Sequence, residues 1–561
     1  MSADGYWIYE HGDYELLLLD QVVKRGLAAN RFVDYAPNYG RPSGVAPRFV
    51  ESGFVESGLV ESGRGRSGRR DRPPHLEQEP LVTSRVRGVG GVFELAAPVL
   101  GRPVIRSSIA PVVVTGESLD ETSTSDHESR HDVVERSPGV WSTVHELGFR
   151  FVRVDVGADV GADEIEIESR VRPVQLTGSF ESSNPRLNEI WATSARTLHL
   201  CMQGLMLDGI KRDRMPWIGD QALTTLANAY TFADGSIARD SITALGRPRH
   251  GYVNGIADYS LWWLINARQY QLHFDDLEHL AREADNIDAF LSNLDRYSEG
   301  GIFRPRAEAD GFEGANAGSV FIDWGAEIDP ARDFTALQVL WCWAVRSGAE
   351  LLATAGHPAA GRWAESAATI TELTVARGWN GSRWSEYLDG DDISPYPNFL
   401  AAVAGLPSSE DAIEAVTDAP RLGTPFMTSF ALLAIGAPAV PRIEQLWGAM
   451  LDAGATTFWE EFAEGSPYAM YGRPFGKSLC HAWSSAPAAL LPQLVLGIRP
   501  TSDGWATFEV RPELGELEWA AATVPTPHGP VRIRADSSGT VVEVPAGTRL
   551  GDHAGPCTVT L

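Results

Sequence analysis

The segment from Asp208 to Asp220, DGIKRDRMPWIGD, is the part of the chain richest in ionisable side chains. It holds three carboxylates, two arginines, a lysine and a tryptophan within 13 residues. These charges could simply pair on a connection between two helices, which stabilises a protein by fractions of a kcal/mol. A surface connection has little need of Trp217, however, and flat aromatic faces suit the apolar faces of sugars. The composition therefore favours a functional loop over a plain connection.

Two later segments carry further candidates for chemistry, GATTFWEE at 454–461 and SLCHAW at 478–483. Glu460 is the candidate carboxylate of the first, although Thr457 and Glu460 also have the spacing of a capping box that would simply begin a helix. His481 in the second lies beside Trp483 and is equally compatible with a hydrogen-bonded core histidine. Carboxylates on two distant loops, with Trp, His and Arg nearby, suit glycoside hydrolysis. In that reaction one protonated acid assists departure of the leaving group and one carboxylate activates water.

The three segments together resemble the bacterial α-L-rhamnosidases, which are inverting glycoside hydrolases. The resemblance runs from about Thr177 to the C-terminus and implies an (α/α)6 barrel catalytic domain of six helical hairpins, flanked by β-sandwich domains. Asp213 lies where the family keeps its general acid, and Glu460 lies at the general base. Many members carry Glu at the acid position, so the shorter Asp213 requires a backbone shift or a closer-bound substrate. The resemblance also implies contacts with the sugar, which are carried by Asp208, Arg212, Trp217, Asp220, Trp459 and His481 and, from weaker matches in ADYSLWW and FIDWG, by Asp258, Trp263, Asp323 and Trp324.

Length and charge restrict the classes of protein to which the chain can belong. A chain of 561 residues exceeds the size of one hydrophobic core, so several domains are expected. Its net charge of −27 repels phosphate backbones and anionic lipids, and we expect neither nucleic acid nor a membrane as partner. The first residues lack a basic signal-peptide region, which predicts a cytoplasmic location.

Cysteines and acidic loops give no indication of a cofactor. The four cysteines are widely scattered, as buried thiols in a reducing compartment would be, and they indicate neither disulfides nor a zinc site. The acidic stretch YLDGDDISP lacks the ligand spacing of a calcium loop. We therefore expect no metal and no other cofactor, and the oligomeric state stays open.

The periodicity of apolar residues divides the chain into three parts. Residues 1–178 are β-rich, with strands expected at 112–114, 149–156 and 164–168, and predict an N-terminal β-sandwich. A tandem FVESG repeat and an Arg-rich stretch predict a flexible insertion near 43–78. A second mobile loop is expected over 117–136.

Residues 179–497 change to a helical period. Asn184 is expected to cap the first helix, with Pro185 at its first position. Amphipathic segments then predict a toroid of helix pairs, with helices expected at 221–232, 259–271, 277–294, 334–354, 359–376, 426–435, 440–453 and 479–494. Residues 498–561 return to strands, expected at 505–510, 531–535 and 540–544, and predict a C-terminal β-sandwich. The fold class is thus multidomain α+β.

The predicted activity is removal of terminal α-L-rhamnose from an oligosaccharide or a plant-type glycoside, with inversion at the anomeric carbon. Inversion requires the two carboxyl groups to lie ~6.5 to 9.5 Å apart. Two alternatives stay open. One is another activity of the same fold, on a different deoxy-sugar or a uronyl sugar, and the other is a catalytically silent sugar-binding protein.

Overall fold

The computed structural model describes residues 5–10, 13–18, 81–123, 130–157, 164–211, 214–246, 252–306, 319–324, 326–419, 422–462, 468–470 and 473–560. The insertion expected near 43–78 lies outside these ranges. Near the N-terminus, β1 (Gly5–Glu10) pairs antiparallel with β2 (Asp13–Leu18), with Gly5 opposite Leu18.

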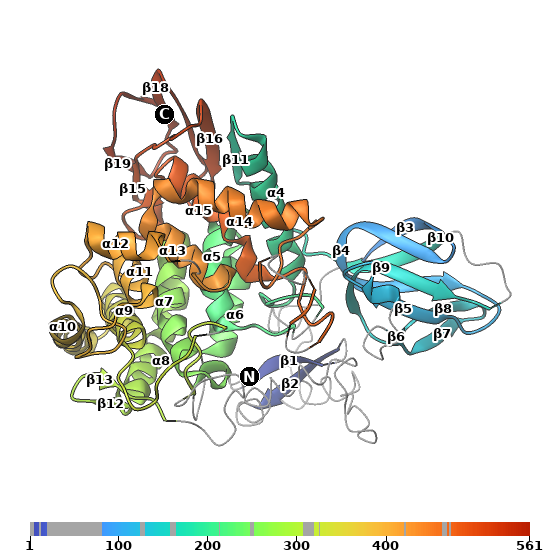
Figure 1. Ribbon diagram of the computed structural model, residues 1–561, viewed down its shortest axis with the longest axis horizontal. Coiled ribbons are helices and arrows are strands. Elements are labelled where there is room, and N and C mark those ends of the chain that lie inside the picture. Colours follow the sequence, from blue (N-terminus) through green and yellow to red (C-terminus); the bar gives the residue numbers. More distant parts are fainter. Residues whose placement is uncertain are drawn as a thin grey trace, which may run out of the picture.

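The N-terminal sheet is an eight-stranded sheet in the order β10-β3-β4-β9-β5-β6, with β8 paired to β4 and β7 (Figure 1). Phe93, Phe149 and Ile167 lie in its buried core. The long β4 shifts its register against β9 between Glu94 and Val99, where Pro98 interrupts the ladder. The predicted strands at 112–114, 149–156 and 164–168 are confirmed. The strands are β3 (Leu81–Val89), β4 (Val92–Arg106), β5 (Val112–Gly116), β6 (Arg130–His131), β7 (Val133–Ser137), β8 (Val140–Thr143), β9 (Leu147–Asp155) and β10 (Glu164–Arg170).

The mobile loop expected over 117–136 is wrong for the part that the structure describes. Glu121–Ser123 form a 3-10 turn in which Glu121 is buried, and β6 and β7 continue the sheet. Glu117 is buried as well, with 3% of its surface exposed. Polar composition alone suggested a loop, but these carboxylates are held by partners that lie far away in the sequence.

The helical region confirms the eight helices expected after Asn184, and the Asn184 side chain caps α4 by accepting a hydrogen bond from the Arg186 amide. Its last expected helix begins later than predicted, at Pro487. The structure adds α6, α11 and α12, three short helices that periodicity did not predict. The helices are α4 (Pro185–Cys201), α5 (Ile218–Tyr230), α6 (Gly235–Leu245), α7 (Ala257–Phe274), α8 (Leu277–Asp295), α9 (Thr335–Thr354), α10 (Ala360–Gly378), α11 (Pro395–Val403), α12 (Glu410–Thr417), α13 (Pro425–Ile435), α14 (Val440–Asp452) and α15 (Pro487–Val495).

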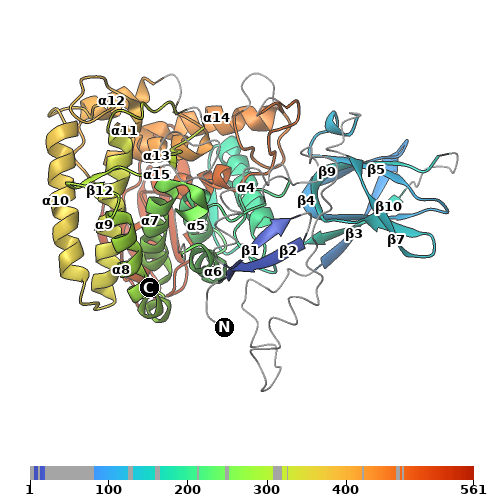
Figure 2. The same cartoon turned by 90° about the horizontal axis from the view of Figure 1, so that it is seen from below.

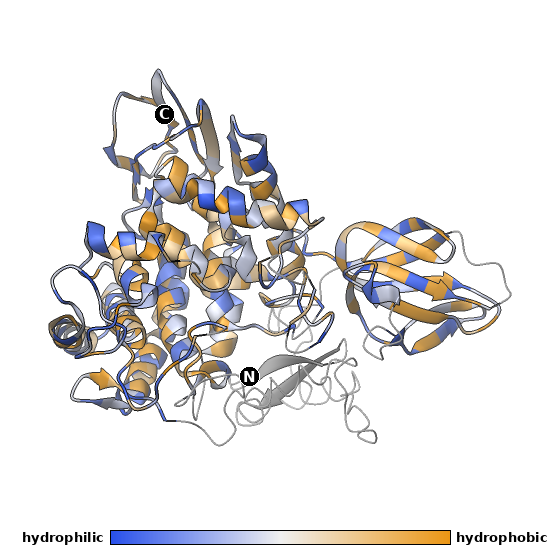
Figure 3. Cartoon of the chain, in the orientation of Figure 1, coloured by the Kyte–Doolittle hydropathy of each residue, from blue (hydrophilic) through white to orange (hydrophobic). Residues whose placement is uncertain are grey.

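Alternate helices form an inner and an outer set (Figure 2). The inner helices α5, α7, α9, α11, α13 and α15 each pack against the next, and α15 packs back on α5. The outer helices lie against them; α10, for example, packs on α9 and α14 packs on α15. Both hydrophobic and hydrophilic residues occur along these helices (Figure 3), as amphipathic packing requires.

Aromatic rings fill the space between the inner helices. Trp262 on α7 stacks on Phe430 of α13 at 4.9 Å, and Phe426 stacks on Trp483 at 5.7 Å. Trp483 lies in the 3-10 turn Ala482–Ser485 that precedes α15. This aromatic core therefore joins α7 and α13 to the segment that carries His481.

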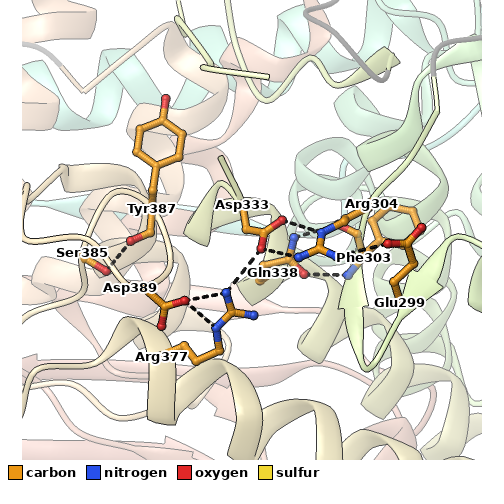
Figure 4. A network of polar contacts seen from close by, with 9 residues as sticks. All are labelled: Glu299, Phe303, Arg304, Asp333, Gln338, Arg377, Ser385, Tyr387 and Asp389. Atoms are coloured by element: carbon orange, nitrogen blue, oxygen red, sulfur yellow. Dashed lines mark hydrogen bonds and ion pairs between the residues drawn. The ribbon is translucent and has the colours of Figure 1, made fainter. Parts of the chain in front are cut away.

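A polar network fixes one rim of the helical region (Figure 4). Arg304 contacts both carboxylate oxygens of Asp333 at 2.8 Å and also reaches Glu299, while Arg377 bridges Asp333 and Asp389. The network connects the hairpin of β12 (Ser298–Glu299) and β13 (Ile302–Phe303) to the start of α9 and the end of α10.

The C-terminal sheets lie above the helices in Figure 1. One has the order β11-β16-β17-β18-β20 and the other β14-β15-β19, and both include the strands expected from the sequence. The first sheet takes β11 (Ser179–Ser182) from residues that precede the helices. The remaining strands are β14 (Arg499–Pro500), β15 (Thr507–Val510), β16 (Trp519–Val524), β17 (Val531–Asp536), β18 (Gly539–Glu543), β19 (Arg549–His553) and β20 (Cys557–Thr560).

All four cysteines are free thiols. Cys201, Cys342 and Cys480 are buried, whereas Cys557 is half-buried. In the described part of the chain, every helix is too short or too polar to traverse a lipid bilayer.

Candidate active site

Asp208 joins the two ends of the charged loop 208–215 through hydrogen bonds to Met215. Its Oδ1 accepts a hydrogen bond from the Met215 amide at 2.9 Å, and its own amide donates to the Met215 carbonyl at 2.9 Å. The side chain is 2% exposed. Arg212 and Asp213 lie inside this loop but outside the residues that the structure describes, so their roles and the distance from Asp213 to Glu460 stay predictions.

The segment with His481 runs alongside the start of this loop. Gly209 pairs with His481 across an antiparallel bridge, and the Ala482 amide donates to the Asp208 carbonyl at 2.6 Å. A Cβ at position 209 would lie 3.0 Å from the Ser478 hydroxyl oxygen, tighter than most side chains tolerate. Glycine at this position thus allows the close approach of the two segments without displacing Ser478.

Glu460 is held against the same segment from the other side. Its amide donates to the Ser478 carbonyl at 2.9 Å, and the Ser478 amide donates to its Oε2 at 3.1 Å. The helix start suggested by Thr457 and Glu460 is wrong, because the Thr457 hydroxyl donates instead to the Leu479 carbonyl. Glu460 is 2% exposed, so a buried carboxylate lies beside the His481 segment.

Asp220 and His481 form the central polar pair of the site. His481 Nε2 lies 3.2 Å from Asp220 Oδ1, and each side chain is 4% exposed. Burial raises the pKa of Asp220 above its ordinary value, and the negative charge of Glu460 adds to this rise, while the hydrogen bond to His481 opposes it. Asp220 lies in the first turn of α5, where the helix dipole favours a carboxylate. The loop, the His481 segment and Glu460 are thus brought together.

Tyr259 is a site residue that the sequence reasoning missed. Its ring meets Trp217 edge to face at 6.0 Å and lies against Gly219, where a Cβ would be 2.9 Å from the tyrosine hydroxyl. Burial raises its pKa, as do the negative charges of Asp220, Asp258, Asp323 and Asp208. Tyr259 thus feels the charges of four predicted sugar-contact residues and packs against a fifth, Trp217. Its position directly after Asp258 in ADYSLWW was the available signal.

Asp258 lies at the start of α7, and both of its carboxylate oxygens accept hydrogen bonds from backbone amides. The Phe321 amide donates to one at 2.7 Å and the Ile322 amide to the other at 3.0 Å. The side chain is fully buried, which raises its pKa to about 6. Ile322 adopts a left-handed φ of 60°, so Asp258 fixes a strained turn.

Asp323 follows that turn and is held in the same manner. Its carboxylate accepts from the Trp324 amide at 2.9 Å, and from the amide and hydroxyl of Thr424 at 2.8 and 2.7 Å. Burial and the charge of Glu461 raise its pKa to about 7. Thr424 caps α13, so Asp323 connects the turn to that helix.

The three predicted tryptophans beyond Trp217 lie in different surroundings. Trp324 is half-buried and meets Phe321 edge to face at 5.0 Å, whereas Trp459 is 3% exposed with Lys477 Nζ 6.0 Å from its ring centre. Trp263 is not brought to the site. Its Nε1 donates to the Ile242 carbonyl of α6, and its ring packs on Phe290 of α8 at 4.4 Å. Among the residues described, no three His, Cys, Asp or Glu side chains are arranged to hold a metal ion.

Two parts of the chain match models of known protein families. Residues 175–372 match the bacterial alpha-L-rhamnosidase 6 hairpin glycosidase domain, and residues 497–551 match the bacterial alpha-L-rhamnosidase C-terminal domain. Residues 175–372 and 497–551 are thus two domains of the bacterial α-L-rhamnosidase family. The resemblance inferred from the sequence is therefore confirmed, and the helical region is a six-hairpin glycosidase domain with accompanying β-sheets. No curated protein matches the chain.

Solved structures share this rhamnosidase fold. The GH78 family rhamnosidase of Bacillus sp. GL1 is 21% identical with a TM-score of 0.69, covering 88% of this chain and 57% of its own. The rhamnosidase from Klebsiella oxytoca with rhamnose bound is 20% identical with a TM-score of 0.60, covering 75% of this chain and 89% of its own. The Streptomyces avermitilis α-L-rhamnosidase complexed with L-rhamnose is 20% identical with a TM-score of 0.63, covering 85% of this chain and 50% of its own. The chain thus spans little more than half the length of the Bacillus enzyme and half that of the Streptomyces enzyme.

Proposed function

We propose that this protein hydrolyses terminal α-L-rhamnosides with inversion at the anomeric carbon. The observation that carries the proposal is the contact of His481 with Asp220, beside Glu460. It joins the start of α5 to the segment with His481, and the Ser478 amide of that segment holds Glu460. Rhamnose is the ligand in two structures of the same fold, which supports a rhamnose-containing glycoside as substrate.

In this reaction one predicted carboxyl group donates a proton to the glycoside, and the other accepts a proton from water. Asp213 gives its proton to the glycosidic oxygen as the bond to the anomeric carbon breaks, and the leaving alcohol departs neutral. Glu460 takes a proton from a water molecule that attacks the same carbon from the opposite face. The geometry expected of the pair is a separation of ~6.5 to 9.5 Å.

The other predicted residues hold the sugar. Asp220, His481 and the Tyr259 hydroxyl offer hydrogen-bonding groups to the sugar hydroxyls, with Trp217 as an aromatic wall. Asp208, Arg212, Trp324 and Trp459 complete the proposed contacts. Asp258 and Asp323 act in this proposal through the turn that they fix, because their oxygens already accept backbone amides.

The finer architecture is part of the same proposal. The cycle of packed inner helices supports an (α/α)6 barrel over residues 179–497, with β-sandwiches at 1–178 and 498–561. A cytoplasmic location, and the absence of nucleic acid and membrane partners, stay predictions from charge and sequence.

NMR of the sugar released from a nitrophenyl α-L-rhamnoside tests substrate and stereochemistry together. We expect the first product to be the β-anomer, before mutarotation. Appearance of the α-anomer first would contradict the inverting mechanism. Release of nitrophenol only from another deoxy-sugar or a uronyl glycoside would contradict the substrate, and rhamnose binding without release would indicate a silent sugar-binding protein.

A further inference from the structure

Glu117 of the N-terminal sheet reaches into the backbone of the helical region. It follows β5 directly, and its side chain is fully buried. Its Oε2 accepts a hydrogen bond from the Leu479 amide at 2.6 Å, across 362 residues of sequence. Leu479 adjoins Ser478, whose amide holds Glu460, and lies two residues before His481. The carboxylate thus fixes the segment to which both site residues are attached.

The same carboxylate faces the middle of the loop that closes at Asp208. Lys211 Nζ lies 3.9 Å from Glu117 Oε2 and 2.7 Å from Glu121 Oε1, and it donates to the Phe475 carbonyl at 3.1 Å. Glu121 in turn accepts from the Glu117 amide at 2.9 Å, so the two acids form one unit. Lys211 is two residues before Asp213 in the sequence. Since Asp208 and Met215 fix only the ends of the loop, this ion pair fixes its centre.

Apolar side chains pack closely where the N-terminal sheet meets the loop 208–215 and the His481 segment. Leu100 of β4, Ile210 of the loop and Cys480 and Ala482 of the His481 segment share one buried cluster with Cys201. A Cβ on Gly148 of β9 would lie 2.2 Å from the Ile210 carbonyl oxygen, so the sheet touches the loop backbone directly. Figures 1 and 2 show β4 on the side of the sheet that faces the helices.

We propose that Glu117 is a positioning residue, through which the N-terminal sheet sets the loop of the predicted acid against the segment of the predicted base. The inference rests on the proposed function. A buried carboxylate that accepts the Leu479 amide and faces the Lys211 ammonium group is costly to displace. Misplacement of reacting groups by about 1 Å can reduce turnover by about 100-fold. The sheet is therefore part of the catalytic apparatus without touching the substrate.

The test compares Glu117→Ala and Glu117→Gln with Glu168→Ala, all in the full chain. Glu168 is the matched control, because it is a carboxylate of the same sheet whose 2.6 Å ion pair is with Arg136, within that sheet. The readouts are kcat and KM for nitrophenyl α-L-rhamnoside, thermal unfolding, and hydrogen exchange of residues 208–211 and 478–483. For Glu117→Ala we expect kcat to fall by about 100-fold and KM to change by less than about threefold. Glu117→Gln keeps an oxygen for the Leu479 amide and should recover part of the loss, while Glu168→Ala should keep the parent kcat.

Faster exchange in both segments of Glu117→Ala, but not of Glu168→Ala, is expected even if no rhamnoside is hydrolysed. An inactive parent with this exchange pattern would contradict the proposed function and leave the coupling of the segments supported. An active parent whose Glu117→Ala variant keeps kcat within about twofold would overturn the positioning role. A loss of kcat that only follows the unfolded fraction, with unchanged exchange in the folded protein, would overturn it as well.

Discussion

His481 Nε2 lies 3.2 Å from Asp220 Oδ1, and the pair joins the start of α5 to the segment before α15. The two residues belong to different sequence motifs, and the packing of α15 on α5 brings them together. The contact therefore brings the first turn of α5 to the segment whose Ser478 amide holds the predicted base Glu460.

Replacing Asp220 by Ala tests the importance of this pair. The change leaves a buried histidine without its carboxylate partner, and we expect kcat/KM for a nitrophenyl rhamnoside to fall by about 100-fold. Steady-state kinetics measure the effect. Asp418→Asn, at the exposed end of α12, is the control and should keep the parent value. An unchanged kcat/KM in Asp220→Ala would exclude the pair from the site.

Replacing Glu460 by Gln removes the predicted base and keeps the side-chain shape. We expect kcat to fall by about 10²- to 10⁴-fold, because the water that attacks loses its proton acceptor. The amide oxygen can still accept from the Ser478 amide, so the melting temperature should change little. Glu414→Gln on α12 is the control. Turnover near the parent rate would refute the assignment of Glu460.

Tyr259→Phe removes the hydroxyl and keeps the ring that packs against Trp217. We expect kcat/KM to fall by about tenfold, the value of one hydrogen bond to a polar partner. Tyr230→Phe on the same inner set of helices is the matched control, because the Tyr230 hydroxyl donates to the Ile498 carbonyl in the core. That variant should lose about 1 kcal/mol of stability and keep its activity. The reverse pattern would place Tyr259 in the core alone.

The raised pKa of Asp323 predicts how stability changes with pH. The folded protein holds this proton up to about pH 7, whereas the ordinary pKa of Asp is 3.8, so the folded state binds more protons between these values. The free energy of unfolding should therefore decrease as the pH rises from about 4 to about 7, by up to roughly 4 kcal/mol. Asp323→Asn cannot titrate, and its unfolding free energy should depend less on pH over this range. Parallel curves for the two proteins, from chemical denaturation, would contradict the prediction.

Local signals predicted local structure well. Asn184 and Pro185 indicated the start of α4, because a cap and its helix are neighbours in the chain. The helix start predicted from Thr457 and Glu460 was wrong because the Thr457 hydroxyl donates to the Leu479 carbonyl, 22 residues away in the sequence. The weaker match in ADYSLWW named Trp263, whose side chain lies instead against α6 and α8, because a short motif does not show which face of a buried helix meets the site. Glu117 was expected in a loop because its partners are Lys211 and Leu479, which only the tertiary fold brings near.

The pairing of β11 with β16 has a consequence for attempts to shorten the protein. Ser179 to Ser182 lie just before the first helix, yet their hydrogen-bonding partners are residues 520–523, beyond the last one. A chain truncated after Gly497 would keep β11 but strip it of its neighbour, leaving an open strand edge of the kind that drives aggregation. A shortened chain that keeps this pairing must therefore extend through the C-terminal sheets, because β16 joins the residues before the first helix to those after the last one.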